Sequence, residues 1–260
     1  MTRMIDYPTL VFLFLFVTYV IVLEIGFRLS VRSHESDDAI LHEQAVGVRD
    51  GVVVLLSLLL GFTLALVLPR SDLRRQLIVD ETNAIGTTNL RAQMLPEPAR
   101  SKTLELLRDY VDARVEFSEK GKVPGGSDEA TRRTHELQAG LWEQAKEAAG
   151  ASPTAITSIY ISSLNDMIDL EAKRVAARRN RVPVPIWIML FLLSILACLS
   201  FGFSLRRRFL LSMLVAPLMI SIVMALIADL DTPNRGFIRV DLDSIHQLQS
   251  DMHSQGAPKP

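Results

Sequence analysis

The sequence predicts an all-α membrane protein, in which four membrane-spanning helices form two pairs on either side of a helical domain. The first indication is composition, because 49% of the 260 residues are hydrophobic while 22% are charged. Separate apolar and charged blocks produce that combination. The second is four apolar stretches, each near the roughly 20 residues that cross a hydrocarbon core. The third is the lack of any strand-like alternation along the chain.

The first pair of spans is expected at residues 8–27 and 51–68, within a segment 1–69. A signal peptide would end its apolar run at small residues, whereas this run ends in Glu24-Ile25-Gly26-Phe27-Arg28. We therefore expect a retained membrane helix. Glu24 and Arg28 are one turn apart, which favours an ion pair near the interface over a functional carboxylate.

The second pair of spans is expected at residues 184–205 and 209–227, within a segment 183–228. Cys198, the single cysteine of the chain, lies in the first of them. One cysteine excludes an intramolecular disulfide and a cysteine-based metal site. A net charge of −1 gives no indication of a nucleic-acid partner.

Between the pairs, residues 70–182 are expected to form a helical cytosolic domain, followed after the second pair by a C-terminal segment 229–260. A helix should continue the second span from Asp72 to Met94, and end before Leu95-Pro96-Glu97-Pro98. Residues 121–127 combine glycine and proline and predict a loop. Ser152 followed by Pro153 predicts the N-cap of the next helix.

Lys and Arg near the membrane ends predict the orientation. Eleven lie on the side of the middle domain and the termini, and six on the opposite side, where Arg206, Arg207 and Arg208 cluster. We therefore expect the domain and both termini in the cytoplasm, with the spans in the cell inner membrane. The arginine triplet opposes this orientation.

A turn is predicted where the fourth span ends. Asp231 starts it, Pro233 fixes φ and Gly236 supplies a position that other residues would find strained. Asp229 and Asp231 also provide oxygen ligands of the kind that Ca²⁺ takes, although such a site needs six or more. A structural turn is the favoured interpretation, with calcium binding as the alternative.

Three polar residues, Glu81, Asn83 and Asn89, lie on the helix that leaves the second span. Buried polar groups are normally paired, so contacts between helices are favoured over the lining of a cytosolic vestibule. Gly86 in mid-helix costs about 1 kcal/mol against alanine, which indicates close packing of another helix.

Several motifs resemble the bestrophin-like family of bacterial membrane proteins. They include Glu-x-Asn-x-Ile-Gly at residues 81–86, Asp-x-Asp-x-Pro-x-x-Gly at 229–236, and the segments 74–91, 95–100, 107–114 and 229–240. The resemblance implies four membrane helices with an intervening helical domain. It also implies an analogy to bestrophins, which are pentameric anion channels with cytosolic termini and an acidic calcium-binding cluster after the last membrane helix.

The analogy nominates pore residues on the second span. Bestrophin pores carry bulky apolar residues four apart, and Val54, Leu58 and Phe62 have that spacing here. Ser57 and Gly61, with Ala65, form a stripe of small residues on the same helix. This stripe can line a pore or let another helix approach closely.

The functional hypothesis is a homo-oligomeric membrane protein that conducts small anions or regulates their flux. The alternative is a non-conducting scaffold or sensor whose helical domain binds a partner. The sequence contains no Gly-rich phosphate loop, no G-x-S-x-G and no H-E-x-x-H, and nothing pairs a nucleophile with a base. We therefore expect no enzyme, no cofactor and no metal centre.

Overall fold

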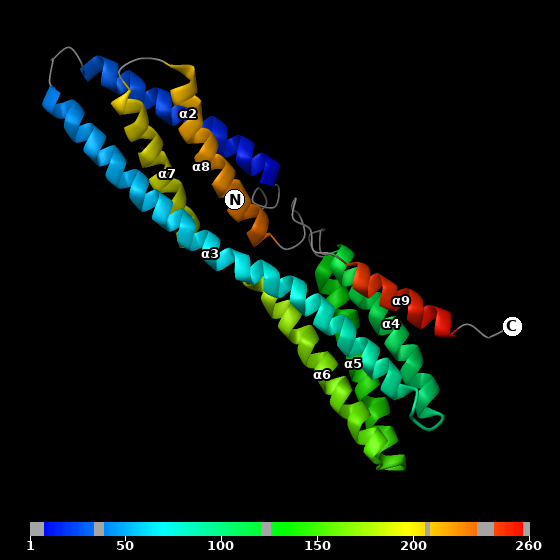
Figure 1. Ribbon diagram of the computed structural model, residues 1–260. Helices are drawn as coiled ribbons and strands as arrows, with labels where there is room; N and C mark the ends of the chain where they lie inside the picture. The colour runs from blue at the N-terminus through cyan, green and yellow to red at the C-terminus, as the bar shows by residue number, and fades with distance from the viewer. Residues whose placement is uncertain (1–7, 34–38, 121–125, 206–208, 233–241, 257–260) are drawn as a thin grey trace. The chain divides into compact units, whose positions relative to one another are not determined.

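The computed structural model describes residues 8–33, 39–120, 126–205, 209–232 and 242–256, and most of these residues are helical, with no strand among them. The prediction of an all-α fold is confirmed. The described helices, shown in Figure 1, are α2 (Pro8–Ser33), α3 (Ala39–Ala92), α4 (Ala99–Lys120), α5 (Gly126–Ala151), α6 (Ala155–Arg179), α7 (Val184–Ser204), α8 (Leu210–Asp231) and α9 (Asp243–Gly256).

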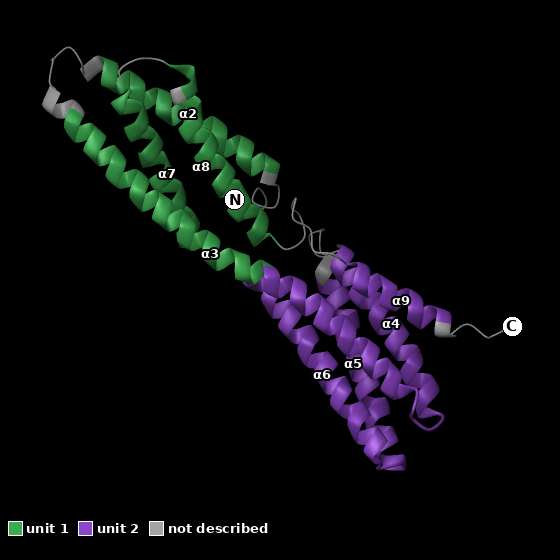
Figure 2. Cartoon of the chain, in the orientation of Figure 1, with its two compact units in different colours: residues 1–71, 181–238 green, residues 72–180, 239–260 purple. Residues whose placement is uncertain are grey.

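The chain divides into two compact units, coloured separately in Figure 2. Unit 1 comprises residues 1–71 and 181–238, and unit 2 comprises residues 72–180 and 239–260. Four helical segments are long and apolar enough to cross a membrane, namely 9–31, 43–92, 155–204 and 213–231. Helix α3 is continuous from unit 1 into unit 2, and Pro69 lies within it without ending it.

In unit 1, helices α2, α7 and α8 enclose an apolar core with Tyr19, Leu23, Leu190 and Met224 fully or almost fully buried. The backbones of α2 and α7 approach each other closely at two glycines. A Cβ added to Gly26 would collide with the backbone carbonyl of Leu199, and one added to Gly202 would collide with that of Leu23. Only a residue without a side chain fits either position, so these two glycines set the crossing.

Near the end of α2, Glu24 and Arg28 form the ion pair that their spacing of four residues predicts. Arg28 Nε donates to Glu24 Oε1 at 2.8 Å, and the arginine side chain is mostly exposed. A pair with this geometry keeps the carboxylate compensated near the end of the apolar stretch.

In unit 2, α4, α5, α6 and the second half of α3 share a second core. Leu107 and Val111 are fully buried on α4, as the apolar periodicity predicts. Helix α9 completes this core, because Ile245 and Met252 are almost entirely buried in it. Gln249 and His253 of α9 both contact Asp112 Oδ1 of α4, at 2.7 Å and 3.0 Å.

Helix α6 begins two residues later than the sequence predicts. The N-cap of α6 is Thr154 and not Ser152, because the Thr154 hydroxyl accepts the Thr157 N–H at 3.3 Å while the Ser152 carbonyl accepts the Thr157 hydroxyl. The predicted loop at 121–127 falls mostly on residues 121–125, which lie outside the described residues, and α5 already begins at Gly126.

Candidate functional site

The pore candidates occupy the face of α3 that unit 1 does not cover. Val54, Leu58 and Phe62 are 66%, 53% and 61% exposed. Ser57 and Gly61 are exposed as well, and a Cβ added to Gly61 would have no neighbour within 4 Å. The opposite face of the same helix packs into the core of unit 1 through Val52, Leu56, Leu60 and Val67. The structure thus places all five candidates on one uncovered side.

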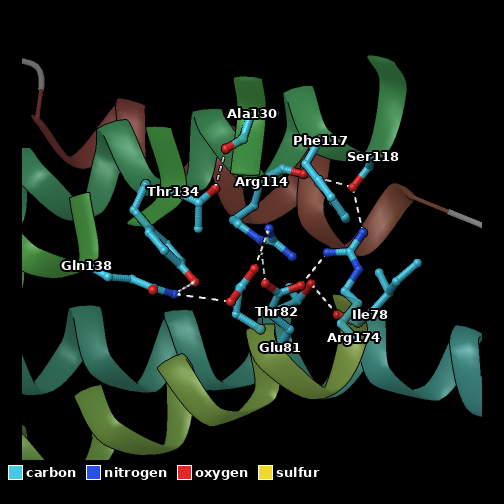
Figure 3. A network of polar contacts seen from close by, with 12 residues as sticks. Ile78, Glu81, Thr82, Arg114, Phe117, Ser118, Ala130, Thr134, Gln138 and Arg174 are labelled. Carbon is cyan, nitrogen blue, oxygen red and sulfur yellow. Dashed lines mark hydrogen bonds and ion pairs between the residues drawn. The ribbon is translucent and has the colours of Figure 1, made fainter. Parts of the chain in front are cut away.

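A second candidate site is a network of ionised side chains in the interior of unit 2, shown in Figure 3. Glu81 of α3 lies between two arginines. Arg114 of α4 donates through Nε to Glu81 Oε1 at 2.5 Å, and Arg174 of α6 donates through Nη1 to Glu81 Oε2. The side chains of Glu81 and Arg114 are fully buried and that of Arg174 is 7% exposed.

Further polar groups surround this centre. Glu171 accepts from Arg114 Nη1 at 3.3 Å, which balances the two guanidinium charges with two carboxylates. Ser118 accepts from Arg174 Nη2 at 2.6 Å. The ring of Phe117 packs against the guanidinium carbons of Arg114 and Arg174, at 4.5 Å and 5.7 Å from its centroid. Among the described groups, Arg114 Nη2 is a buried donor without a partner.

The electrostatics favour an ionised Glu81. Burial by itself raises the pKa of its carboxyl group, since low dielectric disfavours the charge. The charges of Arg114 and Arg174 and their hydrogen bonds outweigh burial, so the pKa of Glu81 lies below its ordinary value. A buried carboxylate held charged by two buried arginines ties three helices together, but offers no free base or nucleophile.

The other polar candidates of α3 are distributed around the helix. Asn89 is buried at 6% exposure, whereas Asn83 is exposed on the surface of the single chain. Gly86 faces α9, where an added Cβ would lie 3.6 Å from Leu248 Cδ1. That is an ordinary van der Waals distance, so another helix does pack beside Gly86 and the space admits a methyl group.

At the end of α8, the fourth candidate span, Asp229 and Asp231 are buried at 4% and 3% exposure. Asp231 Oδ1 accepts the backbone N–H of Val182 at 2.9 Å, which fastens the segment before α7 to the end of α8. The other two residues of the predicted turn, Pro233 and Gly236, lie outside the described residues. Among the described residues, no group of three or more His, Cys, Asp or Glu side chains gathers where it could hold a metal ion.

Sequence reasoning did not identify Arg114, Glu171 or Arg174. A signal was available for Arg114, which follows Leu107 by seven residues and Val111 by three and therefore lies on the buried face of α4. An arginine on an apolar face requires a buried anion nearby. The apolar periodicity of α4 alone does not identify the carboxylate that pairs with Arg114.

Comparison with known proteins agrees with the fold. A crystal structure of a mutated bacterial bestrophin homologue from Klebsiella pneumoniae superposes with a TM-score of 0.67 over 92% of this chain and 97% of that one, at 13% sequence identity. No curated protein sequence matches the chain. Residues 13–245 match the family described as bestrophin-like domain. With nearly its whole length matched, the chain belongs to the bestrophin-like family.

Proposed function

We propose that the protein is a homo-oligomeric membrane channel for small anions, or a regulator of their flux. The observation that carries the proposal is the uncovered apolar side of α3. Only 17% of the apolar window of this helix is buried, against 28% to 39% in the other three candidate spans. If α3 lay at the centre of an oligomer, its uncovered side would contact neighbouring copies of the chain and line a pore between them.

The proposed arrangement places the spans at residues 8–27, 51–68, 184–205 and 209–227. The helical domain 70–182 and the C-terminal segment 229–260 then lie in the cytoplasm, with the protein in the inner membrane. A reporter fused after Pro260 tests the orientation. Alkaline phosphatase at that position should be inactive, and periplasmic activity would reverse the topology.

In the proposed pore, Val54, Leu58 and Phe62 form apolar rungs one helical turn apart. Rings of such residues gate by excluding water from a narrow passage. The adjacent stripe of Ser57, Gly61 and Ala65 lets the α3 helix of a neighbouring copy approach closely. One side of α3 therefore serves the passage and the neighbouring side serves assembly.

Charge supports anions over cations as the permeating species. Arg70, Arg74 and Arg75 follow the apolar stretch of α3, and a further group of basic residues precedes α7, namely Lys173, Arg178, Arg179 and Arg181. A positive potential at one end of a pore concentrates anions there.

Chloride flux into liposomes that contain the purified protein tests the proposal. Wild type should carry flux above protein-free liposomes. Phe62→Ala should increase it, because the largest rung is removed. Ile21→Ala is the matched control, since Ile21 is 54% exposed and belongs to α2, not to α3. Folded, oligomeric protein without flux would favour a non-conducting scaffold.

A further inference from the structure

A groove in unit 1 runs between α3 and α8 and has a volume of about 650 Å³. Its walls are mostly apolar, formed by Val53, Leu56 and Leu60 of α3 and by Val215, Met219 and Val223 of α8, and Ser57 of α3 is a polar lining residue. Phe201 and Leu205, at the end of α7, line it near Arg49. The size is that of sites that take small molecules.

The length of the groove fits one leaflet of a bilayer. It extends along α3 from Arg49 to Leu60, which at 1.5 Å per residue is about 16 Å. Half of a hydrocarbon core of about 30 Å is about 15 Å. A membrane helix of another copy would cross both leaflets, whereas a single acyl chain ends at the middle.

Arg49 lines the polar end of the groove, and it pairs there with Asp50, which does not itself line the groove. Arg49 lies directly before the apolar stretch of α3, at headgroup depth, and its side chain is 26% exposed. It donates to Ser204 Oγ at 3.2 Å and stacks over Phe201 at 5.5 Å from the ring centroid. The carboxylate of Asp50 lies 2.8 Å from Arg49 Nη2 and is 63% exposed.

We propose that this groove is a binding site for a zwitterionic phospholipid with a primary ammonium headgroup. One acyl chain lies between α3 and α8. The phosphate lies against Arg49, which binds phosphate oxygens through a planar fork of donors. The ammonium lies against Asp50, and the N–H groups of the ammonium donate hydrogen bonds to the Asp50 carboxylate that a quaternary ammonium cannot donate. The negative charge of Asp50 would repel a lipid with a net negative charge.

Lipid titration of the full-length chain in mild detergent tests the site. Dioleoyl phosphatidylethanolamine, phosphatidylcholine and phosphatidylglycerol are added separately, and bound lipid is counted by native mass spectrometry. We expect phosphatidylethanolamine to bind about fivefold more tightly than the other two, which corresponds to roughly one charge contact at the membrane surface. Equal affinity for all three would overturn the headgroup assignment.

Two neighbouring positions on α8 provide a matched pair of variants. Met219→Trp fills the groove, whereas Leu218→Trp adds similar bulk to a partly exposed residue that does not line it. Lipid binding should fall in the first and persist in the second. If Met219→Trp instead lowers the oligomeric mass and leaves lipid binding unchanged, a second copy occupies the groove and the lipid assignment is wrong.

The headgroup residues give a second, independent readout. Asp50→Asn removes an exposed charge and should shift the preference towards phosphatidylglycerol. Arg49→Gln should remove discrimination among the three lipids, and its melting temperature without lipid shows whether the fold survives. An unchanged lipid preference in Asp50→Asn would refute the site. None of these measurements requires ion flux, so they stand apart from the channel proposal.

Discussion

The two compact units hold their helices together by different means. Unit 1 packs α2 against α7 through glycine, with two backbones in contact and almost no charge in the core. Unit 2 buries two carboxylates and two guanidinium groups among its helices. Apolar helices in lipid gain little from burying more apolar surface, so close approach must fix their geometry. Outside the apolar stretches, hydrophobic burial supplies the stability and paired charges can select one arrangement.

The largest expected effect comes from breaking the charge balance of unit 2. Glu81→Gln keeps the shape of the side chain but leaves Arg114 and Arg174 without their shared anion. Breaking a buried pair typically costs about 3–5 kcal/mol. The melting temperature in detergent should fall strongly. Glu97→Gln, at the exposed pair with Arg100, is the control and should melt as wild type.

Acid should act on the same group. The pKa of Glu81 in the folded state lies below its ordinary value of 4.5. At a pH between the folded-state pKa and 4.5, the unfolded state therefore binds more protons than the folded state. The free energy of unfolding contributed by Glu81 is fully present above pH 4.5 and is lost as pH falls through the folded pKa. The difference in melting temperature between wild type and Glu81→Gln should stay constant from pH 7 to 5 and narrow only below 4.5. If the difference in melting temperature between the two proteins already narrowed at pH 6, the lowered pKa of Glu81 would be contradicted.

The glycine crossing of unit 1 gives the next largest effect. Gly202→Ala places a methyl group against the Leu23 carbonyl, so α2 and α7 must separate. Overpacking costs typically about 1–3 kcal/mol. Yield and melting temperature should both fall. Gly61→Ala makes the same chemical change where no atom lies within 4 Å and should leave the fold of a single chain intact. Equal behaviour of the two variants would mean that the crossing does not depend on glycine.

A smaller effect is expected at the end of α8. Asp231→Ala removes the acceptor of the Val182 N–H, and an unsatisfied buried donor costs about 1–3 kcal/mol. Asp231→Asn retains an oxygen there and should cost less. Melting with calcium and with chelator separates a structural role from a ligand role. A calcium-dependent rise in wild type that the Asp229→Asn, Asp231→Asn double variant loses would establish a metal site.

Sequence patterns predicted the helices better than their partners. Apolar length marks the spans. No proline lies between Arg70 and Pro96, which predicts that α3 continues past Arg70, and Pro69 does not end the helix. Periodicity assigns Leu107 to a buried face without saying what covers it. The meeting of Glu81 with Arg114, 33 residues apart, and with Arg174, 93 residues apart, depends on the three-dimensional course of the chain. The contact at Gly26 and Gly202 was missed for the same reason.

The place of α9 in the core of unit 2 has a consequence for biosynthesis. Ile245 and Met252 are synthesised after α7 and α8, yet they complete a core whose other helices precede α7. The helices between Ala99 and Arg179 must therefore wait, with part of their apolar surface uncovered, while the ribosome finishes the chain. A stop codon before Asp243 would leave that surface open permanently, and such a truncated product should be a preferred substrate for quality-control proteases.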